Sequence, residues 1–221
     1  MPWYVLTGTP GAGKTAIIRQ LERDGFSVVE EAATDVIALE HALGQPEPWT
    51  RPGFTDRIAA LQQRRERLAA TGAGGAPAPV FFDRSPVCTL ALSRFLGAPP
   101  SPLLAAEVDR VVRDRLYERS VFFVRNQGFV APTGARRITL ADSLAFEEVH
   151  EQTYRELGFA LIEVPAGPLP DRAALVRREA LRLAGQDAAG HCAGGANQVS
   201  GSSSMSGAPA DASAPTTRVR R

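Results

Sequence analysis

Eight residues near the N-terminus have the spacing of a phosphate-binding loop. The segment Gly8–Thr15 matches G-x-x-x-x-G-K-[ST] at every fixed position. Glycines let the backbone wrap closely and point its N–H groups at phosphate oxygens. We expect Lys14 to reach the β- and γ-phosphates of ATP and the Thr15 hydroxyl to bind Mg²⁺. The expected nucleotide-binding residues are Gly8, Thr9, Pro10, Gly11, Ala12, Gly13, Lys14 and Thr15.

The position of the single lysine supports this assignment. The 25 basic residues comprise Lys14 and 24 arginines. An ammonium group can enter between two phosphates as a point charge, which a planar guanidinium does less readily. The same count excludes the N-K-x-D segment by which guanine-specific GTPases recognise their base.

A candidate metal ligand follows a short apolar run. Val80-Phe81-Phe82-Asp83 has the Walker-B pattern, in which the final aspartate helps to hold Mg²⁺. Arg84 comes next, where motor-type ATPases usually place a water-activating glutamate. The order Asp83-Arg84-Ser85 instead resembles the D/E-R-S motif of deoxynucleoside and thymidylate kinases. That resemblance implies that Arg84 contacts phosphates or the substrate.

Two neighbouring glutamates are candidates for the base of a transfer reaction. Glu30 and Glu31 follow an apolar run, and ligands of open α/β sheets bind at the carboxyl ends of the strands. Deoxynucleoside kinases place there the carboxylate that receives the proton of the acceptor hydroxyl. Because side chains alternate along a strand, only one glutamate should face the crevice, and we favour Glu30. The alternative is a solvated helix start that the helix dipole stabilises.

Apolar runs and chain breakers predict strands that alternate with helices. The expected strands cover residues 3–7, 26–29, 80–82, 121–124 and 159–164, and the expected helices cover 13–23, 32–43, 55–70, 86–96, 102–117, 140–157 and 171–183. This alternation predicts an α/β fold with a parallel sheet covered on both faces.

The C-terminal stretch differs from the rest of the chain in composition. From Gly185 onward, small residues dominate and no periodic apolar pattern is present. Such a segment cannot bury enough surface to order itself. We therefore expect a nucleotide-binding domain over residues 1–184 and a disordered tail over residues 185–221.

The overall composition narrows the classes of partner. The formal charge of +1 argues against a duplex nucleic-acid binder, which usually has a strong basic excess. No apolar run approaches the roughly 20 residues that cross a bilayer. Cys88 and Cys192 cannot form a disulfide framework, which fits a cytoplasmic protein. The histidine and cysteine spacings do not predict a zinc site.

Most of residues 3–183 resembles a predicted-ATPase family of P-loop proteins with an AAA domain. This family is related to the nicotinamide-riboside kinase domain of NadR-type NAD regulators. The matching segments are 8–15, 29–33, 82–85 and 146–165. The resemblance implies a kinase-like three-layer sandwich with a five-stranded parallel sheet of order 2-3-1-4-5. Many members carry Asp-Arg-Gly where this chain has Asp83-Arg84-Ser85-Pro86, and this difference could reshape the acceptor side.

Arginines follow the fourth expected strand. Arg125, Arg136 and Arg137 flank or lie within the irregular segment 126–138, where related kinases carry an arginine-bearing lid. Such a lid excludes water and neutralises the charge of the transferring phosphoryl group. Solvated loop arginines are the alternative for Arg136 and Arg137.

Acceptor recognition has only weak signals. Trp49 and Phe54 lie in the insertion where nucleoside kinases hold the acceptor, and Gln62 or Gln63 could hydrogen-bond a base or amide. Core packing of the aromatic side chains and solvation of the glutamines are the alternatives, and we favour them.

Together these residues predict an ATP-dependent phosphotransferase, that is, a P-loop small-molecule kinase. Its expected partners are Mg-ATP and a small hydroxylated or nucleoside-like acceptor. The second hypothesis is a regulatory switch that binds ATP or GTP and hydrolyses it slowly. A switch needs the phosphate loop and Asp83 but neither Glu30 nor Glu31. A eukaryotic branch of the family, described as a GTP- and phosphoinositide-binding regulator, belongs to that second class.

Overall fold

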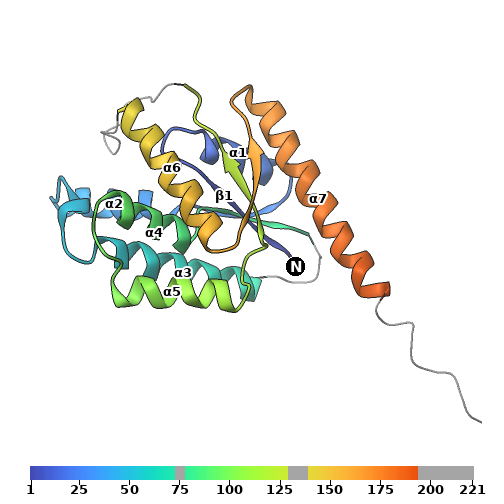
Figure 1. The fold of residues 1–221 in the computed structure, drawn as a ribbon, viewed down its shortest axis with the longest axis horizontal. Coiled ribbons are helices and arrows are strands. Elements are labelled where there is room, and N and C mark those ends of the chain that lie inside the picture. Colours follow the sequence, from blue (N-terminus) through green and yellow to red (C-terminus); the bar gives the residue numbers. More distant parts are fainter. Residues whose placement is uncertain (73–77, 129–138, 194–221) are drawn as a thin grey trace, which may run out of the picture.

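An apolar strand lies at the centre of the molecule. All five residues of β1 (Trp3–Thr7) are buried, because helices cover both faces of the sheet. It pairs in parallel with β3 (Val80–Asp83) and β4 (Ser120–Val124). The edge strands are β2 (Ser27–Val29) and β5 (Ala160–Val164), so the order is β2-β3-β1-β4-β5. Strand β1 lies in the middle of the molecule in Figure 1. The predicted parallel sheet and its strand order are confirmed.

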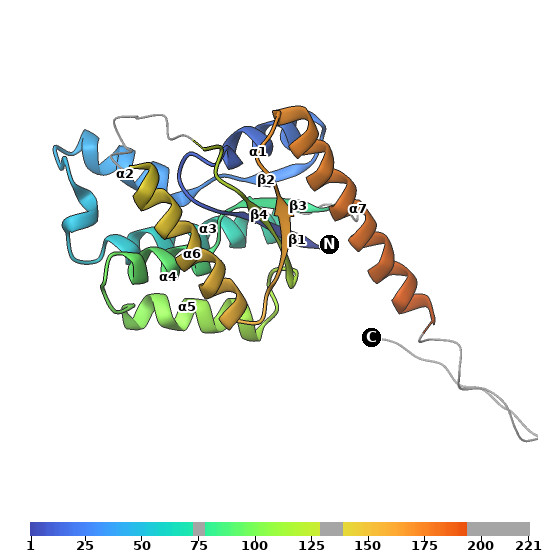
Figure 2. The same ribbon diagram turned by 45° about the horizontal axis from the view of Figure 1, so that its top comes forward.

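The computed structural model describes residues 1–72, 78–128 and 139–193. Its helices are α1 (Lys14–Arg23), α2 (Ala32–Ala42), the short 3₁₀ helix η1 (Pro48–Thr50), α3 (Phe54–Gly72), α4 (Pro86–Phe95), α5 (Pro102–Arg113), α6 (Leu140–Glu156) and α7 (Leu169–Ala193). Helices α1 and α7 cover one face of the sheet and α3 to α6 the other, which makes three layers (Figure 2). In the described parts of the chain, no helix is both long and apolar enough to cross a membrane.

Alternation along the strands separates two cores. Tyr4 and Phe81 pack with α1 and α7, whereas Trp3 and Phe82 pack with the helices of the opposite face. Full burial of a large apolar side chain contributes about 1.5–3 kcal/mol. The two cores therefore fix the strand ends and the loops that leave them.

Helix α7 passes the domain boundary that the sequence predicted at residues 184 and 185. It continues to Ala193, the last residue that the structure describes, so the expectation of disorder was wrong for residues 185–193. Three of these nine residues are alanine, which has the highest helix propensity and offsets the two glycines. Residues 194–221 lie outside the described part of the chain, and a disordered tail there stays a prediction.

The carboxyl ends of three strands lead into the candidate site. Strand β1 runs into α1, β2 into α2, and β3 into α4. Because the strands are parallel, these turns lie at the same edge of the sheet, where open α/β folds bind ligands.

Candidate active site

The loop between β1 and α1 has a backbone that depends on its glycines. Gly8, Gly11 and Gly13 all have positive φ. A Cβ atom on Gly8 would lie 2.3 Å from the carbonyl oxygen of Val124, so a larger residue cannot replace it without a backbone shift. The loop ends at the N-terminus of α1, whose dipole favours an anion.

Lys14 is buried beneath this loop. Its Nζ donates a hydrogen bond to the carbonyl oxygen of Thr9 at 2.7 Å. Burial and the neighbouring Arg84 cation lower the pKa of Lys14 to about 7, against the opposing effect of the Asp83 and Glu31 carboxylates. A bound phosphate would raise this pKa again, because an anion favours the charged ammonium.

Thr15 and Asp83 form a pair that fits a magnesium ion. The Thr15 hydroxyl donates to Asp83 Oδ2 at 2.9 Å, and Asp83 Oδ1 is buried with no hydrogen-bond partner among the described residues. Burial, and next the Glu31 carboxylate, raise the pKa of Asp83. A bound cation would offset both the loss of solvation and the repulsion between the two carboxylates. Hydroxyl and carboxylate oxygens are ligands that Mg²⁺ accepts.

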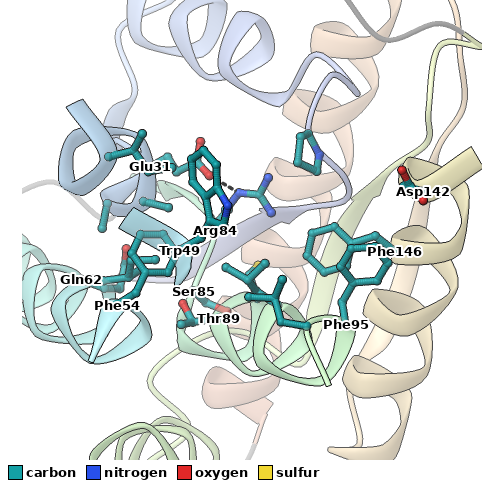
Figure 3. Close-up of a pocket in the computed structure, with 18 residues that line it drawn as sticks. Glu31, Trp49, Phe54, Gln62, Arg84, Ser85, Thr89, Phe95, Asp142 and Phe146 are labelled. Carbon is teal, nitrogen blue, oxygen red and sulfur yellow. Dashed lines mark ion pairs between the residues drawn. The ribbon is translucent and has the colours of Figure 1, made fainter. Parts of the chain in front are cut away.

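Glu31 and Arg84 form an ion pair beside the loop (Figure 3). Arg84 has a left-handed backbone (φ 76°) directly after β3, and its Nη1 donates to the carbonyl oxygen of Gly8 at 3.1 Å. Burial alone raises the pKa of Glu31, but Arg84 and Lys14 outweigh it and hold that pKa below its usual range. Glu31 is therefore ionised at neutral pH.

Two cavities meet at this ion pair. The smaller, of about 300 Å³, lies over the phosphate loop and is lined by Gly13, Lys14 and Thr15, among others. The larger, of about 430 Å³, extends toward α3, α4 and α6. Residues that line both are Pro10, Glu31, Ala33, Ile37 and Arg84. A group in one cavity can therefore lie next to a group in the other.

The larger cavity has mostly apolar walls (Figure 3). Trp49 and Phe54 lie on one side, and Phe95 and Phe146 stack on the other with ring centroids 4.6 Å apart. The polar side chains on its wall are Glu31, Gln62, Arg84, Ser85, Thr89 and Asp142. Few polar groups on an aromatic wall are typical of a small-molecule site.

Comparison with protein-family models matches residues 3–172 to a family described as an AAA domain. The chain belongs to this AAA-domain family. The match contains the phosphate loop, Glu31, Asp83 and Arg84, so the resemblance seen in the sequence is confirmed. A comparison with curated proteins found no match.

Solved structures similar to this AAA-domain protein include deoxyadenosine kinase from M. mycoides. Its structure with the products dCMP and a flexible dCDP has a TM-score of 0.56 and 14% identity, and the match covers 80% of this chain and 97% of that one. The structure of the same enzyme with bound dCTP has a TM-score of 0.54 and 15% identity, and the match covers 81% of this chain and 98% of that one. At this identity the likeness establishes a P-loop kinase-like fold.

The two glutamates of the AAA-domain protein point to different places. Glu31 lines both cavities, whereas Glu30 is exposed and lines a separate surface hollow with Arg65 and Leu68. The backbone carbonyl of Glu30 accepts a hydrogen bond from Arg65 at 3.0 Å. The expectation that Glu30 rather than Glu31 faces the crevice was wrong, because β2 ends at Val29 and the following turn brings Glu31 inward as the N-cap residue of α2.

Arg84 has a neighbour that sequence reasoning missed. His150 of α6 is fully buried, and its Nδ1–H donates to the carbonyl oxygen of Phe146 at 3.1 Å. Its Nε2 therefore accepts from Arg84 Nη1, at 3.4 Å. Burial and the Arg84 cation lower the pKa of His150, so the ring is neutral. No spacing in the sequence links these two residues, which are 66 positions apart.

The glutamines and aromatic residues of the insertion also differ in position. Gln62 lines the larger cavity and donates to the Tyr117 hydroxyl at 3.4 Å. Gln63 instead donates to Glu107 at 2.9 Å, outside that cavity. Trp49 and Phe54 pack in a small apolar cluster and also line the larger cavity. Core packing and contact with an acceptor are therefore compatible for these two side chains.

The expected lid arginines do not join this site in the described part of the chain. Arg125 forms ion pairs with Glu147, Glu151 and Glu163, and these neutralise its charge. The role expected for Arg125 in a lid is therefore not supported. Arg136 and Arg137 lie outside the described residues.

Proposed function

We propose that the protein is an ATP-dependent phosphotransferase that acts on a small hydroxylated, nucleoside-like acceptor. The observation that carries this proposal is the meeting of two cavities at Glu31 and Arg84. A nucleotide-binding switch needs only the cavity over the phosphate loop. A phosphotransferase needs a second cavity whose occupant can approach the γ-phosphate.

The phosphate side would hold Mg-ATP through the loop amides, Lys14, Thr15 and Asp83. The Thr15 hydroxyl and the Asp83 oxygen that has no hydrogen-bond partner among the described residues would supply oxygen ligands for Mg²⁺. When bound, Mg²⁺ neutralises charge on the β- and γ-phosphate oxygens. Lys14 adds a positive charge from the interior of the loop, and the family match supports nucleotide binding at this segment.

The acceptor side would supply the nucleophile. The acceptor hydroxyl oxygen forms a bond to the γ-phosphorus as the bond from phosphorus to the β,γ-bridging oxygen breaks, which releases ADP. The hydroxyl proton passes to the Glu31 carboxylate, which is ionised and lines both cavities. Arg84 holds Glu31 in place and carries positive charge near the transferring group.

The charges of the larger cavity favour an acceptor without a phosphate of its own. Among the described residues that line it, Arg84 is the one cation, and Glu31 already pairs with it. Asp142 adds a negative charge. An acceptor monophosphate would find no unpaired cation among the described lining residues, whereas a neutral aromatic or heteroaromatic alcohol matches the apolar walls.

An acceptor panel tests this proposal. The full chain is incubated with Mg-ATP and single nucleosides, aromatic alcohols or the matching monophosphates, and phosphorylated products are detected by mass spectrometry. We expect product from at least one unphosphorylated alcohol and none from its monophosphate. If ATP turns over at the same slow rate with every compound and no product forms, the switch should replace the phosphotransferase.

A further inference from the structure

Arg172 is a cation in a position that costs free energy. It lies in the first turn of α7, is only 5% exposed, and forms no ion pair with any described residue. A helix N-terminus carries positive partial charge, so a cation is unfavourable there. Burial accordingly lowers the pKa of Arg172, with no carboxylate to oppose it. Such a placement requires a compensating contact.

Three acceptors provide such contacts. The side-chain amide of Gln127 faces the guanidinium, and its oxygen accepts from Arg172 Nη2 at 3.0 Å. The other two are backbone carbonyl oxygens, one of which belongs to the phosphate loop. Arg172 Nη2 donates to the carbonyl oxygen of Ala12 at 2.7 Å and to that of Arg125 at 3.4 Å. A Cβ atom on Gly13 would lie 2.8 Å from Arg172 Nη1, so the glycine leaves room for the guanidinium. Arg172 is not among the described residues that line the cavity over the loop, so its guanidinium contacts the loop backbone from the side away from that cavity.

The Ala12 carbonyl and the Gly13 N–H belong to one peptide group. A cation that hydrogen-bonds to the oxygen of a peptide polarises it and makes its N–H a stronger donor. The N–H groups of this type of loop bind the phosphates of the nucleotide. We propose that Arg172 is a positioning residue of the phosphate site, which holds and polarises the Ala12–Gly13 peptide from behind. This role rests on the nucleotide binding in the proposed function.

Substitution at Arg172 tests the role through binding alone. Arg172→Met removes the charge and the donors, and Arg172→Lys restores the charge. We expect Arg172→Met to weaken ATP and ADP about 10- to 100-fold, the weight of one hydrogen bond to a charged group, with partial recovery in Arg172→Lys. Arg177→Met is the matched control, because Arg177 lies on the same helix with a side chain 51% exposed. It should bind both nucleotides as the wild type does.

A purely structural role would not distinguish between ligands. We expect AMP, measured by displacement of a fluorescent ADP, to lose less affinity than ADP, because its single phosphate makes fewer contacts with the loop. Equal losses for AMP, ADP and ATP would overturn the proposal, as would ATP affinity within twofold of the wild type. Arg172→Gln, which keeps a neutral donor, provides the same comparison if Arg172→Met does not fold. A wild-type chain that does not bind ATP would overturn this role and the proposed function together.

Discussion

The two cavities of the site are built in different ways. The one over the phosphate loop takes most of its wall from one contiguous stretch, between Pro10 and Ala16. The larger one takes its wall from α2, η1, α3, α4 and α6, which extend from Ala32 to Glu156 in the sequence. A contiguous site keeps its geometry wherever the motif occurs, whereas an assembled site changes with every packing contact. The cavity over the phosphate loop can therefore be assigned to a broad class. Under the proposed function, the larger cavity selects the acceptor.

The largest effect that separates the two cavities is expected at Lys14. Lys14→Ala should weaken Mg-ATP at least about 100-fold, because it removes a charged donor to the phosphates. Leu39→Ala, on an exposed side chain of α2, is the control and should bind normally. Calorimetry on both variants measures the affinity. Unchanged binding in Lys14→Ala would contradict the assignment of Lys14 and its loop to the phosphates of ATP.

A smaller effect, confined to the acceptor, is expected at Trp49. This side chain lines the larger cavity and is not among the residues that line the loop cavity. Trp49→Ala should raise the KM for a confirmed acceptor about tenfold, since it removes a stacking and apolar surface. ATP affinity should stay within twofold. A loss of ATP affinity as large as the rise in acceptor KM would show that the two cavities are not independent.

A pH effect is also expected in the cavity over the phosphate loop. The pKa of Lys14 is about 7 without ligand, and bound phosphate favours its charged form. Binding of ATP should therefore take up protons, and ATP affinity should fall as the pH rises from about 7 to 9. Calorimetry in buffers of different ionisation enthalpy measures the uptake. The control is Lys14→Met, in which the pH dependence above pH 7 should disappear; its persistence would assign the titration to another group.

The sequence was sufficient for most of the fold and for the family to which the phosphate loop belongs. The phosphate loop has fixed spacing, and the alternating apolar runs predicted the parallel sheet. The strand order was implied by the family resemblance alone. The sequence could not decide between Glu30 and Glu31, because that depends on where β2 ends and how the chain turns into α2. If the strand ends one residue earlier or later, the other of the two neighbouring glutamate side chains faces the crevice.

Other parts of the site depend on tertiary packing. His150 contacts Arg84, and Arg172 contacts Ala12, from helices far along the chain. The left-handed backbone of Arg84 could not be predicted from its residue type. The ending of α7 was missed for a different reason. The helix propensity of alanine opposes the low apolar content of residues 185–193, and the sequence does not show which of the two prevails.

The central claim is that Glu31 accepts the acceptor's proton where the two cavities meet. Glu31→Gln keeps the size of the side chain and removes its basicity, and Glu30→Gln is a matched control one residue away on the exposed side. The measurement is kcat with a confirmed acceptor. We expect Glu31→Gln to lower it by about 10²–10⁴-fold, the usual weight of general acid–base catalysis, with Glu30→Gln unchanged and ATP affinity within a few-fold in both. Full turnover in Glu31→Gln, or an equal loss in Glu30→Gln, would contradict the account.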